Sequence, residues 1–415
     1  MSAETKTATT PEPEPAPGFG WLIAAPHRLF FFLGSMLLLI ASAWWALVLL
    51  LRVYGLAIPA AVAPMFVHAA AMLYTFLPMY MFGFLFTAGP AWLAVKGPGA
   101  PALLATALFA FAGGAGMVIL SVVSMPAAGV AALLLCLGWI RFVLMFGRLI
   151  RQSAAADRRH AVFVFAFMLP GIAGVAGYAL LCLGADPGWF AWIVIAGLWW
   201  YTIPVFLVVV HRMLPFFTAA AIPSIAVWRP FWILWCFLGA SVGHGAVELA
   251  GLSRFAWILD APAAAFLLWL GLRWGLVHSL HIRLLAMLHL GFVWLGIAYA
   301  LYAADGLLAA AGARGLGLAP LHAATMGFAA TVLFAMITRV TRGHSGRSLT
   351  ADDASWRLFW LLQAATLLRI AAEPWPQAYP WLVGASGLAW LVAFAGWGWI
   401  YLPAYLSARA DGKPG

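Results

Sequence analysis

Charged residues are scarce in this sequence. Asp, Glu, Lys and Arg make up only 8% of the 415 residues, whereas 66% are hydrophobic and the mean hydropathy is +1.00. An ordinary soluble domain is about 25% charged, so this chain lacks the polar surface that a water-facing globule needs. The composition therefore excludes a soluble enzyme and a disordered protein, and it indicates a protein whose solvent is lipid.

Cysteine is also rare. Cys136, Cys182 and Cys236 lie in apolar stretches without CxxC spacing, which argues against a disulfide framework and against a thiolate metal site. The net charge of +10 does not indicate a nucleic-acid partner, because the 22 basic residues are scattered singly or in pairs along the chain. We interpret them as markers of membrane topology.

Long apolar runs dominate what is present. Because they are continuous rather than alternating, they predict membrane-spanning helices and not barrel strands. We expect an all-α polytopic membrane protein with about twelve transmembrane helices in a single domain over residues 21–406. A disordered, proline-rich tail is expected at 1–20, which lacks the pattern of a cleavable signal, and a short tail at 407–415. The predicted spans are 28–51, 60–89, 101–121, 126–150, 160–184, 189–214, 229–250, 256–277, 283–305, 320–341, 355–373 and 382–406.

The distribution of basic residues predicts the orientation. Seventeen lie at the N-terminus, in the even-numbered connections and at the C-terminus, and only Arg52, Arg254 and Arg314 lie in the odd-numbered connections. Cytoplasmic loops carry the excess of Lys and Arg. Both termini are therefore expected in the cytoplasm, which agrees with an even number of spans.

Ten histidines are the main candidates for chemistry, because a polar group at membrane depth is costly and needs a partner. His68, His244 and His322 fall toward the outer face. His244 and Glu248 are four residues apart and share one face of a helix. Imidazole is a common metal ligand, and a nearby carboxylate can orient it. The outer set thus predicts a polar site for copper or haem, and hydrogen bonds to carbonyls or lipid headgroups are the structural alternative.

The inner face holds more histidines, and His160 is assigned to a charged loop. His289 lies about two turns inside its predicted helix, beyond the headgroups, and is the preferred axial ligand of a haem. A guanidinium binds carboxylates bidentately, so nearby arginines are candidates to hold haem propionates or an anionic lipid, with simple anchoring as the alternative. The inner candidates are His27, His211, His278, His281, His344, Arg28, Arg212, Arg339 and Arg347. His278 and His281 are expected to be a solvated pair.

Six strings along the chain also carry a resemblance to a known family. They are APHRLFFFLG at 25–34, VHAAAMLYTFLPMYMFGFLFTAGPAWL at 67–93, HRMLPFFT at 211–218, LHLGFVWL at 288–295, LHAATMGF at 321–328 and MITRVTRGHSGRSL at 336–349. Together they are similar to the NnrS family of haem- and copper-containing bacterial membrane proteins. The last string is the most specific, because TRV is followed by GHSGR at the end of the tenth predicted span.

The resemblance implies a twelve-span protein of the bacterial cytoplasmic membrane that responds to nitric oxide, functions in denitrification and nitrosative stress, and carries haem and copper. The family pattern falls on Arg28, His68, Arg212, Pro215, His289, His322, Arg339, His344 and Arg347. Where many members have HxHEM in the second helix, this chain has His68 followed by three alanines and Met72. A copper site near His68 would therefore need His244 or His322 as a further ligand.

The leading hypothesis is a haem and copper protein that binds, detoxifies or senses nitric oxide, with a metal-dependent oxidoreductase as the enzymatic form. Glu248 and Glu373 are candidate proton relays from the outer side. A haem-copper oxidase is disfavoured because its histidine pair and HxH string are absent. The alternative from another class is a transporter or a haem or copper delivery protein, for which Arg141, Arg369 and Asp260 would line a path. The expected partners are the lipid bilayer and an electron donor that the sequence does not identify.

Overall fold

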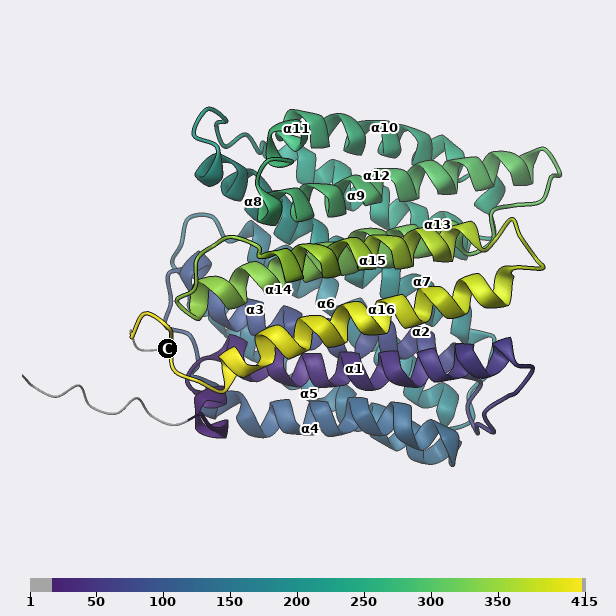
Figure 1. Ribbon diagram of the computed structural model, residues 1–415, viewed down its shortest axis with the longest axis horizontal. Helices are drawn as coiled ribbons and strands as arrows, with labels where there is room; N and C mark the ends of the chain where they lie inside the picture. Colours follow the sequence, from purple (N-terminus) through teal and green to yellow (C-terminus); the bar gives the residue numbers. More distant parts are fainter. Residues whose placement is uncertain (1–16, 413–415) are drawn as a thin grey trace, which may run out of the picture.

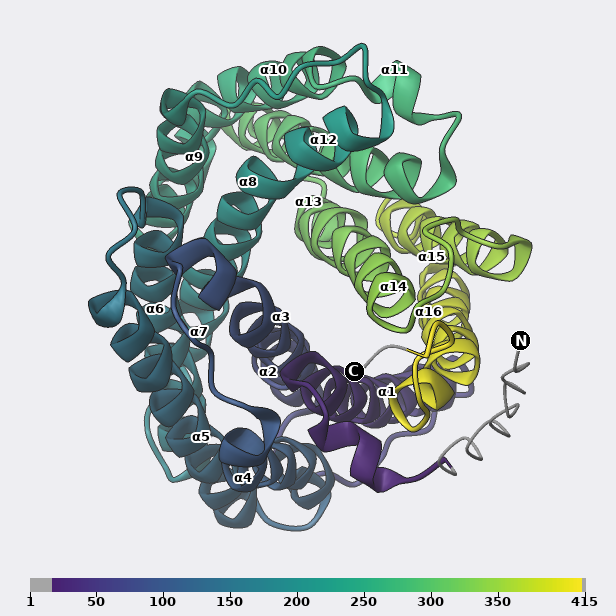
Figure 2. The same cartoon turned by 90° about the vertical axis from the view of Figure 1, so that its left-hand side faces the viewer.

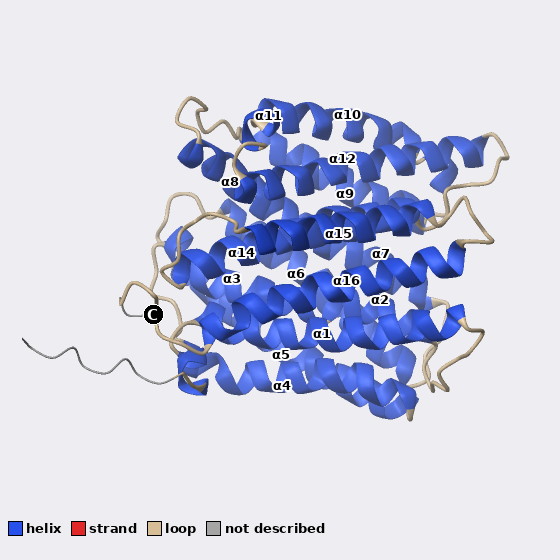
Figure 3. Cartoon of the chain, in the orientation of Figure 1, coloured by secondary structure: helices blue, strands red, loops and turns tan. Residues whose placement is uncertain are grey.

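The computed structural model describes residues 17–412, which fold into a bundle of long helices running in alternating directions (Figure 1). Over this part of the chain there is no strand (Figure 3). Ten helices or consecutive helix pairs within it are long and apolar enough to cross a membrane. These observations confirm an all-α polytopic membrane protein. The two other expected spans correspond to α10 (Trp257–Arg273) and the more polar α15 (Asp353–Ala371), which lie in the same bundle.

The spans fall into three consecutive groups of four. The first contains α1 (Pro26–Val53), α2 (Pro64–Tyr74) with α3 (Phe76–Leu93), α4 (Ala100–Ile119) and α5 (Met125–Gln152). The second contains α6 (Arg159–Cys182), α7 (Trp189–Gly197) with α8 (Ile203–Ala221), α9 (Phe231–Leu249) and α10. The third contains α12 (Arg283–Ala310), α13 (Ala319–His322) with α14 (Thr331–His344), α15 and α16 (Tyr379–Tyr401), and the short α11 (Leu276–Ser279) precedes it.

The second span of each group lies inside the bundle. Viewed from one end, α2 with α3, α7 with α8, and α13 with α14 are surrounded by the other spans (Figure 2). Their most apolar windows are 83%, 78% and 72% buried, against 67% or less for the other candidate spans. The surrounding ring closes because α16 packs against α1. The fold is thus a three-part ring around three inner spans.

Each inner span is interrupted part-way. Pro78 cannot donate a hydrogen bond to the Tyr74 carbonyl, which explains why α2 ends and α3 begins there. Pro204 likewise leaves the Trp200 carbonyl without its helical donor, and the π-helical turn η3 (Leu198–Thr202) joins α7 to α8. The third inner span contains the π-helical turn η5 (Ala323–Ala330), after which the Thr331 hydroxyl donates to the Met326 carbonyl. The helix α14 (Thr331–His344), which directly follows η5, contains no proline.

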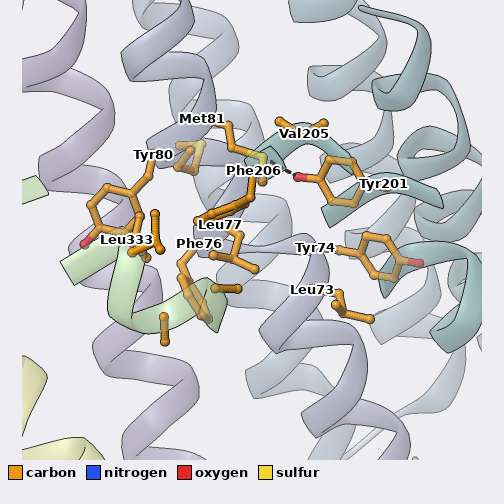
Figure 4. Packing of buried hydrophobic residues seen from close by; sticks show 14 of the residues in the cluster. Leu73, Tyr74, Phe76, Leu77, Tyr80, Met81, Tyr201, Val205, Phe206 and Leu333 are labelled. Carbon is orange, nitrogen blue, oxygen red and sulfur yellow. Dashed lines mark hydrogen bonds between the residues drawn. The ribbon is translucent and has the colours of Figure 1, made fainter. Parts of the chain in front are cut away.

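The core between the inner spans is rich in aromatic side chains. Tyr74, Tyr80, Met81, Tyr201 and Phe206 are among the buried residues drawn in Figure 4. The Tyr201 hydroxyl donates to the Met81 sulfur at 3.0 Å, which joins η3 to α3. A buried hydroxyl needs such a partner, since burial without a hydrogen bond is costly.

Both described ends of the chain lie at the same end of the bundle (Figure 1), which we call the inner end; the opposite end is the outer end. Most of the expected tail at 1–20 falls on residues 1–16, outside the described residues, and the short helix η1 (Phe19–Ile23) begins within its last part. At the other terminus, η6 (Leu402–Tyr405) follows α16, and the Ala410 amide donates to the Ser345 carbonyl at 2.9 Å. The described residues after η6, up to 412, therefore fold back onto the inner end.

Candidate functional site

A central apolar cavity lies between the three inner spans. Its walls come from α3, α8 and α14, with Phe31 of α1 at the side, and it encloses about 540 Å³ of empty space, open mouth included. Tyr80, Phe206, Leu333 and Met336 are among its lining residues, three of which appear in Figure 4. About 60 Å³ of this space can hold the centre of a water-sized molecule, where about 10–15 Å³ suffices for one water, so the space suits a very small apolar ligand.

Two predicted histidines meet at the inner end of this region. The rings of His27 on α1 and His344 at the end of α14 have their centroids 4.4 Å apart. His27 also contacts Phe31, one turn along α1, and Phe31 lines the cavity. His27 is buried, and its Nδ1 atom has no hydrogen-bond partner. The sequence strings APHRL and RGHSGR are therefore adjacent in space.

Arg28 is buried next to this histidine pair. Its Nη1 atom donates to the Ser407 carbonyl at 2.7 Å, and its guanidinium lies 5.7 Å from the Trp21 ring centroid. Its Nη2 atom is buried without a hydrogen-bond acceptor. Since a buried cationic donor needs an acceptor, this atom is suited to an anionic oxygen.

Two further predicted arginines lie toward the inner end of the cavity walls. On α8, Arg212 follows the lining residue Val209 by three positions and so projects from the same helical face. Its guanidinium lies 4.7 Å from the ring centroid of Trp92, and that of Arg339 lies 4.1 Å from the ring centroid of Phe217. The ion pairs of residues 17–412 include neither arginine. Both charges are therefore available to an anion.

His211 lies on the face of α8 that points away from the cavity, and it pairs with His160, whose position was predicted wrongly from the sequence. His160 was expected on a charged loop, but it is the second residue of α6 and is 3% exposed. Its Nε2 atom lies 3.0 Å from His211 Nδ1, and His211 Nε2 donates to the Pro230 carbonyl at 3.3 Å. Two basic residues before His160 suggested a loop, and the apolar run that follows was the signal for a helix start.

His289 on α12 has the hydrogen bonding expected of a metal-ligating imidazole. The Thr218 hydroxyl donates to the Leu214 carbonyl at 2.9 Å, so its oxygen accepts from His289 Nε2, also at 2.9 Å. In the neutral ring, Nδ1 then carries the lone pair. This atom is buried without a partner. A ligating histidine is commonly oriented by such a hydrogen bond from its other nitrogen.

At the outer end, His68 of α2 and His322 of α13 lie close enough to interact electrostatically, and both sense Arg369. His68 stacks on Trp45 with centroids 4.0 Å apart, and its Nδ1 atom has no partner. His322 Nδ1 donates to the Leu318 carbonyl at 2.9 Å, which leaves Nε2 as the lone-pair nitrogen. The two outer histidines of the inner spans therefore lie in the same part of the outer end, and no direct contact between them is among the described interactions.

The other predicted residues have simpler surroundings. Glu373 accepts a hydrogen bond from Arg369 at 2.8 Å and lines an outer pocket with Arg314 and Tyr379. Arg347 is exposed in the connection after α14. His278 is exposed on α11, as expected.

His244 of α9 is wholly buried near the outer end, between two carboxylates. Its Nδ1 atom lies 2.8 Å from Asp260 of α10, and its Nε2 atom lies 3.4 Å from Glu248. The ring of Trp199 packs against it, with centroids 4.1 Å apart. The i, i+4 spacing predicted the contact with Glu248, whereas Asp260 is separated by 16 residues and a turn.

A comparison with protein families matches residues 21–409 to NnrS, described as NnrS protein. The chain belongs to the NnrS family. This membership supports a general role in the nitric oxide response. No curated protein sequence matches the chain.

The side chains of this NnrS protein fit haem better than they fit a copper centre. Within residues 17–412, no three or more His, Cys, Asp or Glu side chains are grouped so that they could hold a metal ion. A copper centre with three protein ligands does not fit this arrangement. Haem iron needs only one or two axial nitrogens, because the macrocycle supplies the other four. The Nδ1 atom of His289, which has no hydrogen-bond partner, meets that requirement. The arginines without ion-pair partners suit the carboxylates of haem.

Proposed function

We propose that this chain is a haem protein of the bacterial cytoplasmic membrane that binds nitric oxide, with both termini in the cytoplasm. The single observation behind the proposal is the buried His289, whose Nε2 atom is held by Thr218 and whose Nδ1 atom has no partner. Such an imidazole is held in an orientation in which its free nitrogen would bind the iron of haem.

The central cavity supports nitric oxide as the ligand. Nitric oxide is small and uncharged, so it enters an apolar membrane protein from the lipid without a polar channel. Apolar cavities stay dry and accept small apolar molecules. Phe31, Phe206, Leu333 and the other lining side chains exclude water from this space.

The chain's own residues would divide the work as follows. His289 would hold the iron of haem, and Thr218 keeps its ring in one tautomer. Arg212 and Arg339 would bind the carboxylates of haem at the inner end, where neither has an acidic partner among the described ion pairs. When bound, haem supplies an iron centre that coordinates nitric oxide. Whether nitric oxide is then reduced, oxidised or only sequestered depends on an electron donor.

His27 is the second candidate for the iron. It lies beside the cavity wall with an unpaired, buried Nδ1 and next to Arg28, whose Nη2 atom also lacks a partner. This position combines an imidazole, an apolar cavity and an anion acceptor at one place. The variants described below distinguish the two positions.

Copper, if it binds, is best accommodated by His68 and His322. Each has one nitrogen without a hydrogen-bond partner, but a third protein ligand is lacking in the described chain. We therefore propose at most a two-histidine copper site. Metal analysis of His68→Ala against wild type tests it, with retained copper as the contradicting result.

Absorbance spectroscopy tests the haem proposal. The protein, purified after production with haem supplied, should show a Soret band that shifts when nitric oxide is added. His289→Ala should lose this band while His27→Ala retains it, and the reverse result would place the iron at His27. His278→Ala is the matched control, since His278 is exposed at the same end of the bundle. A colourless wild-type protein would contradict the proposal and favour a transporter or a delivery protein.

A transporter has less support from the architecture. Many transporters are built from two repeated halves with a site at their interface. This bundle instead has three groups of four spans, and one span of each group lies inside.

A further inference from the structure

We propose that Glu248, His244 and Asp260 form a proton relay that opens at the outer end of the bundle. The three side chains come from two helices, α9 and α10, and form one continuous row. This relay does not depend on where haem binds.

The row runs from a partly exposed carboxylate to a buried one. The Glu248 side chain is 23% exposed, whereas His244 and Asp260 are 0% exposed. Glu248 Oε1 lies 3.4 Å from His244 Nε2, and His244 Nδ1 lies 2.8 Å from Asp260 Oδ1. His244 Nδ1 is therefore hydrogen-bonded toward the interior, whereas Nε2 has no hydrogen-bond partner and lies within ion-pair distance of Glu248 toward the surface.

This arrangement favours proton exchange over metal binding. The two carboxylates lie on opposite nitrogens of the imidazole, so they cannot join one ring nitrogen in holding a single ion. An imidazole that accepts a proton at one nitrogen and releases one from the other is a natural proton shuttle. His244 is accordingly not among the metal ligands that we propose.

Charge balance requires the row to carry exchangeable protons. Two ionised carboxylates and one imidazolium would leave a net negative charge at a wholly buried histidine. An unbalanced charge is costly away from water. A second proton on one carboxylate makes the row neutral, so the neutral row shares two protons among three groups.

The other groups around His244 are neutral in their ordinary states. Trp199 and Tyr302 pack on its ring with centroids 4.1 and 4.3 Å away, and Tyr299 lies at 6.0 Å. Asp305 of the same helix as the tyrosines is farther away and accepts a hydrogen bond from the Leu316 amide. No described cation forms an ion pair with His244, Glu248 or Asp260.

The buried end of the row also has atoms that could take part in proton transfer. Asp260 Oδ2 is buried without a hydrogen-bond partner, as is the hydroxyl of Tyr299 on α12. Unpaired buried polar atoms are rare. Here they provide the next acceptor position after the histidine.

One transfer proceeds without any outside reactant except the proton itself. When the row has lost one of its two protons, Asp260 is ionised, His244 is neutral with its hydrogen on Nδ1, and Glu248 holds the remaining proton. That proton passes to His244 Nε2, and the proton on Nδ1 passes to Asp260. The O–H bond of Glu248 and the Nδ1–H bond break, the Nε2–H bond and the O–H bond of Asp260 form, and the imidazole ends in its other tautomer. A further proton taken up by Glu248 then restores the neutral row. Net charge moves inward by one proton.

Infrared spectroscopy of the full chain in nanodiscs tests the relay, because a protonated carboxyl group has a distinct C=O stretch. Wild-type protein should show this band at neutral pH, and Asp260→Asn should lose it. Glu248→Gln should keep the band but slow its shift in D₂O by about tenfold or more, because the entry carboxyl is gone. Glu248→Asp should restore part of the rate.

Two controls separate the relay from other effects. Asp157→Asn removes an exposed carboxylate at the inner end and should change neither the band nor its exchange. Glu248 is partly exposed, so the Gln variant keeps the proposal testable even if Asp260→Asn does not fold. Haem absorbance should be unchanged in Glu248→Gln, so loss of the haem proposal and loss of the relay give different results.

Two outcomes would overturn the relay. The first is equal exchange rates in wild type and Glu248→Gln, which would make the row a fixed hydrogen-bonded cluster. The second is bound copper or zinc that is removed by His244→Gln, which would make it a metal site.

Discussion

The Tyr74 hydroxyl donates a hydrogen bond of 2.6 Å to the Ile193 carbonyl and so joins the inner span of the first group to that of the second. The tyrosine is wholly buried, and its hydroxyl lies between Gly174 of α6 and Gly197 of α7. A methyl group on either glycine would collide with the ring's oxygen. The close approach of three helices therefore depends on these two small residues.

Gly197→Ala should destabilise the protein by about 1–3 kcal/mol, because overpacking forces the Tyr74 ring out of its position. The measurement is the apparent thermal unfolding midpoint in nanodiscs. Gly239→Ala is the matched control, since a methyl group there meets no atom within 4 Å and alanine favours a helix. An equal loss in both variants would contradict this reasoning.

His160→Leu and His211→Leu should each cost about 1–3 kcal/mol, because each leaves the partner's buried nitrogen without its hydrogen bond. The double variant should lose less than the sum of the two. A double-mutant cycle in urea measures the difference, expected at about 0.5–3 kcal/mol. Strict additivity would show that the 3.0 Å contact contributes nothing.

Asp352 should make the inner end sensitive to acid. Burial raises the pKa of this carboxyl, but hydrogen bonds from Ser355 and the charge of Arg342 outweigh burial and hold the pKa below its ordinary value. Stabilisation is then complete above the unfolded value of about 3.9 and is lost as the pH falls through the lower folded pKa. Thermal midpoints between pH 7 and pH 3 measure this loss, which Asp352→Asn should reduce.

Substitutions of Asp352 can distinguish its role as the N-cap of α15 from its ion pair with Arg342. Asp352 Oδ1 accepts from the Ser355 amide at the start of α15, and Oδ2 pairs with Arg342 at 3.0 Å. Asparagine caps a helix as well as aspartate, so Asp352→Asn should cost less than about 1 kcal/mol, and Asp352→Ala about 1–2. Equal effects of the two substitutions would mean that the cap is unimportant.

Cysteine labelling should place the two ends of the bundle on opposite sides of the membrane. Ala156 lies in an exposed inner connection and Ala313 in an exposed outer one, and Cys236 is the exposed native cysteine to be replaced first. In spheroplasts, whose cytoplasmic membrane stays sealed, an impermeant maleimide should label Ala313→Cys and not Ala156→Cys. The reverse pattern would contradict the orientation that the basic residues predict.

The sequence predicted the helical spans well because hydropathy alone decides whether a long segment tolerates lipid. Its predicted boundaries, such as 126–150 against the observed Met125–Gln152, differ by a few residues. The three-part arrangement was not predicted, since the inner spans carry no strong sequence repeat. The sequence indicates only two of the three interruptions, through Pro78 and Pro204.

The candidate site was predictable in its residue types but not in its pairings. Helical spacing placed His244 beside Glu248, because four residues make one turn. The contacts between His27 and His344, and between His289 and Thr218, join residues far apart in the chain. Such pairings depend on which helices become neighbours, and periodicity within one helix does not carry that information.

Because α1 and α16 close the ring, any of the three groups could come first in the chain without changing which groups are neighbours. The Gly18 amide donates to the Leu406 carbonyl at 2.8 Å, so the two ends of the folded chain already touch. A circularly permuted chain that begins at α6, with its original ends joined by a short linker, would keep every contact between neighbouring spans except the α5 to α6 connection itself. The packing of the bundle then depends on the closed ring of spans and not on which span comes first in the chain.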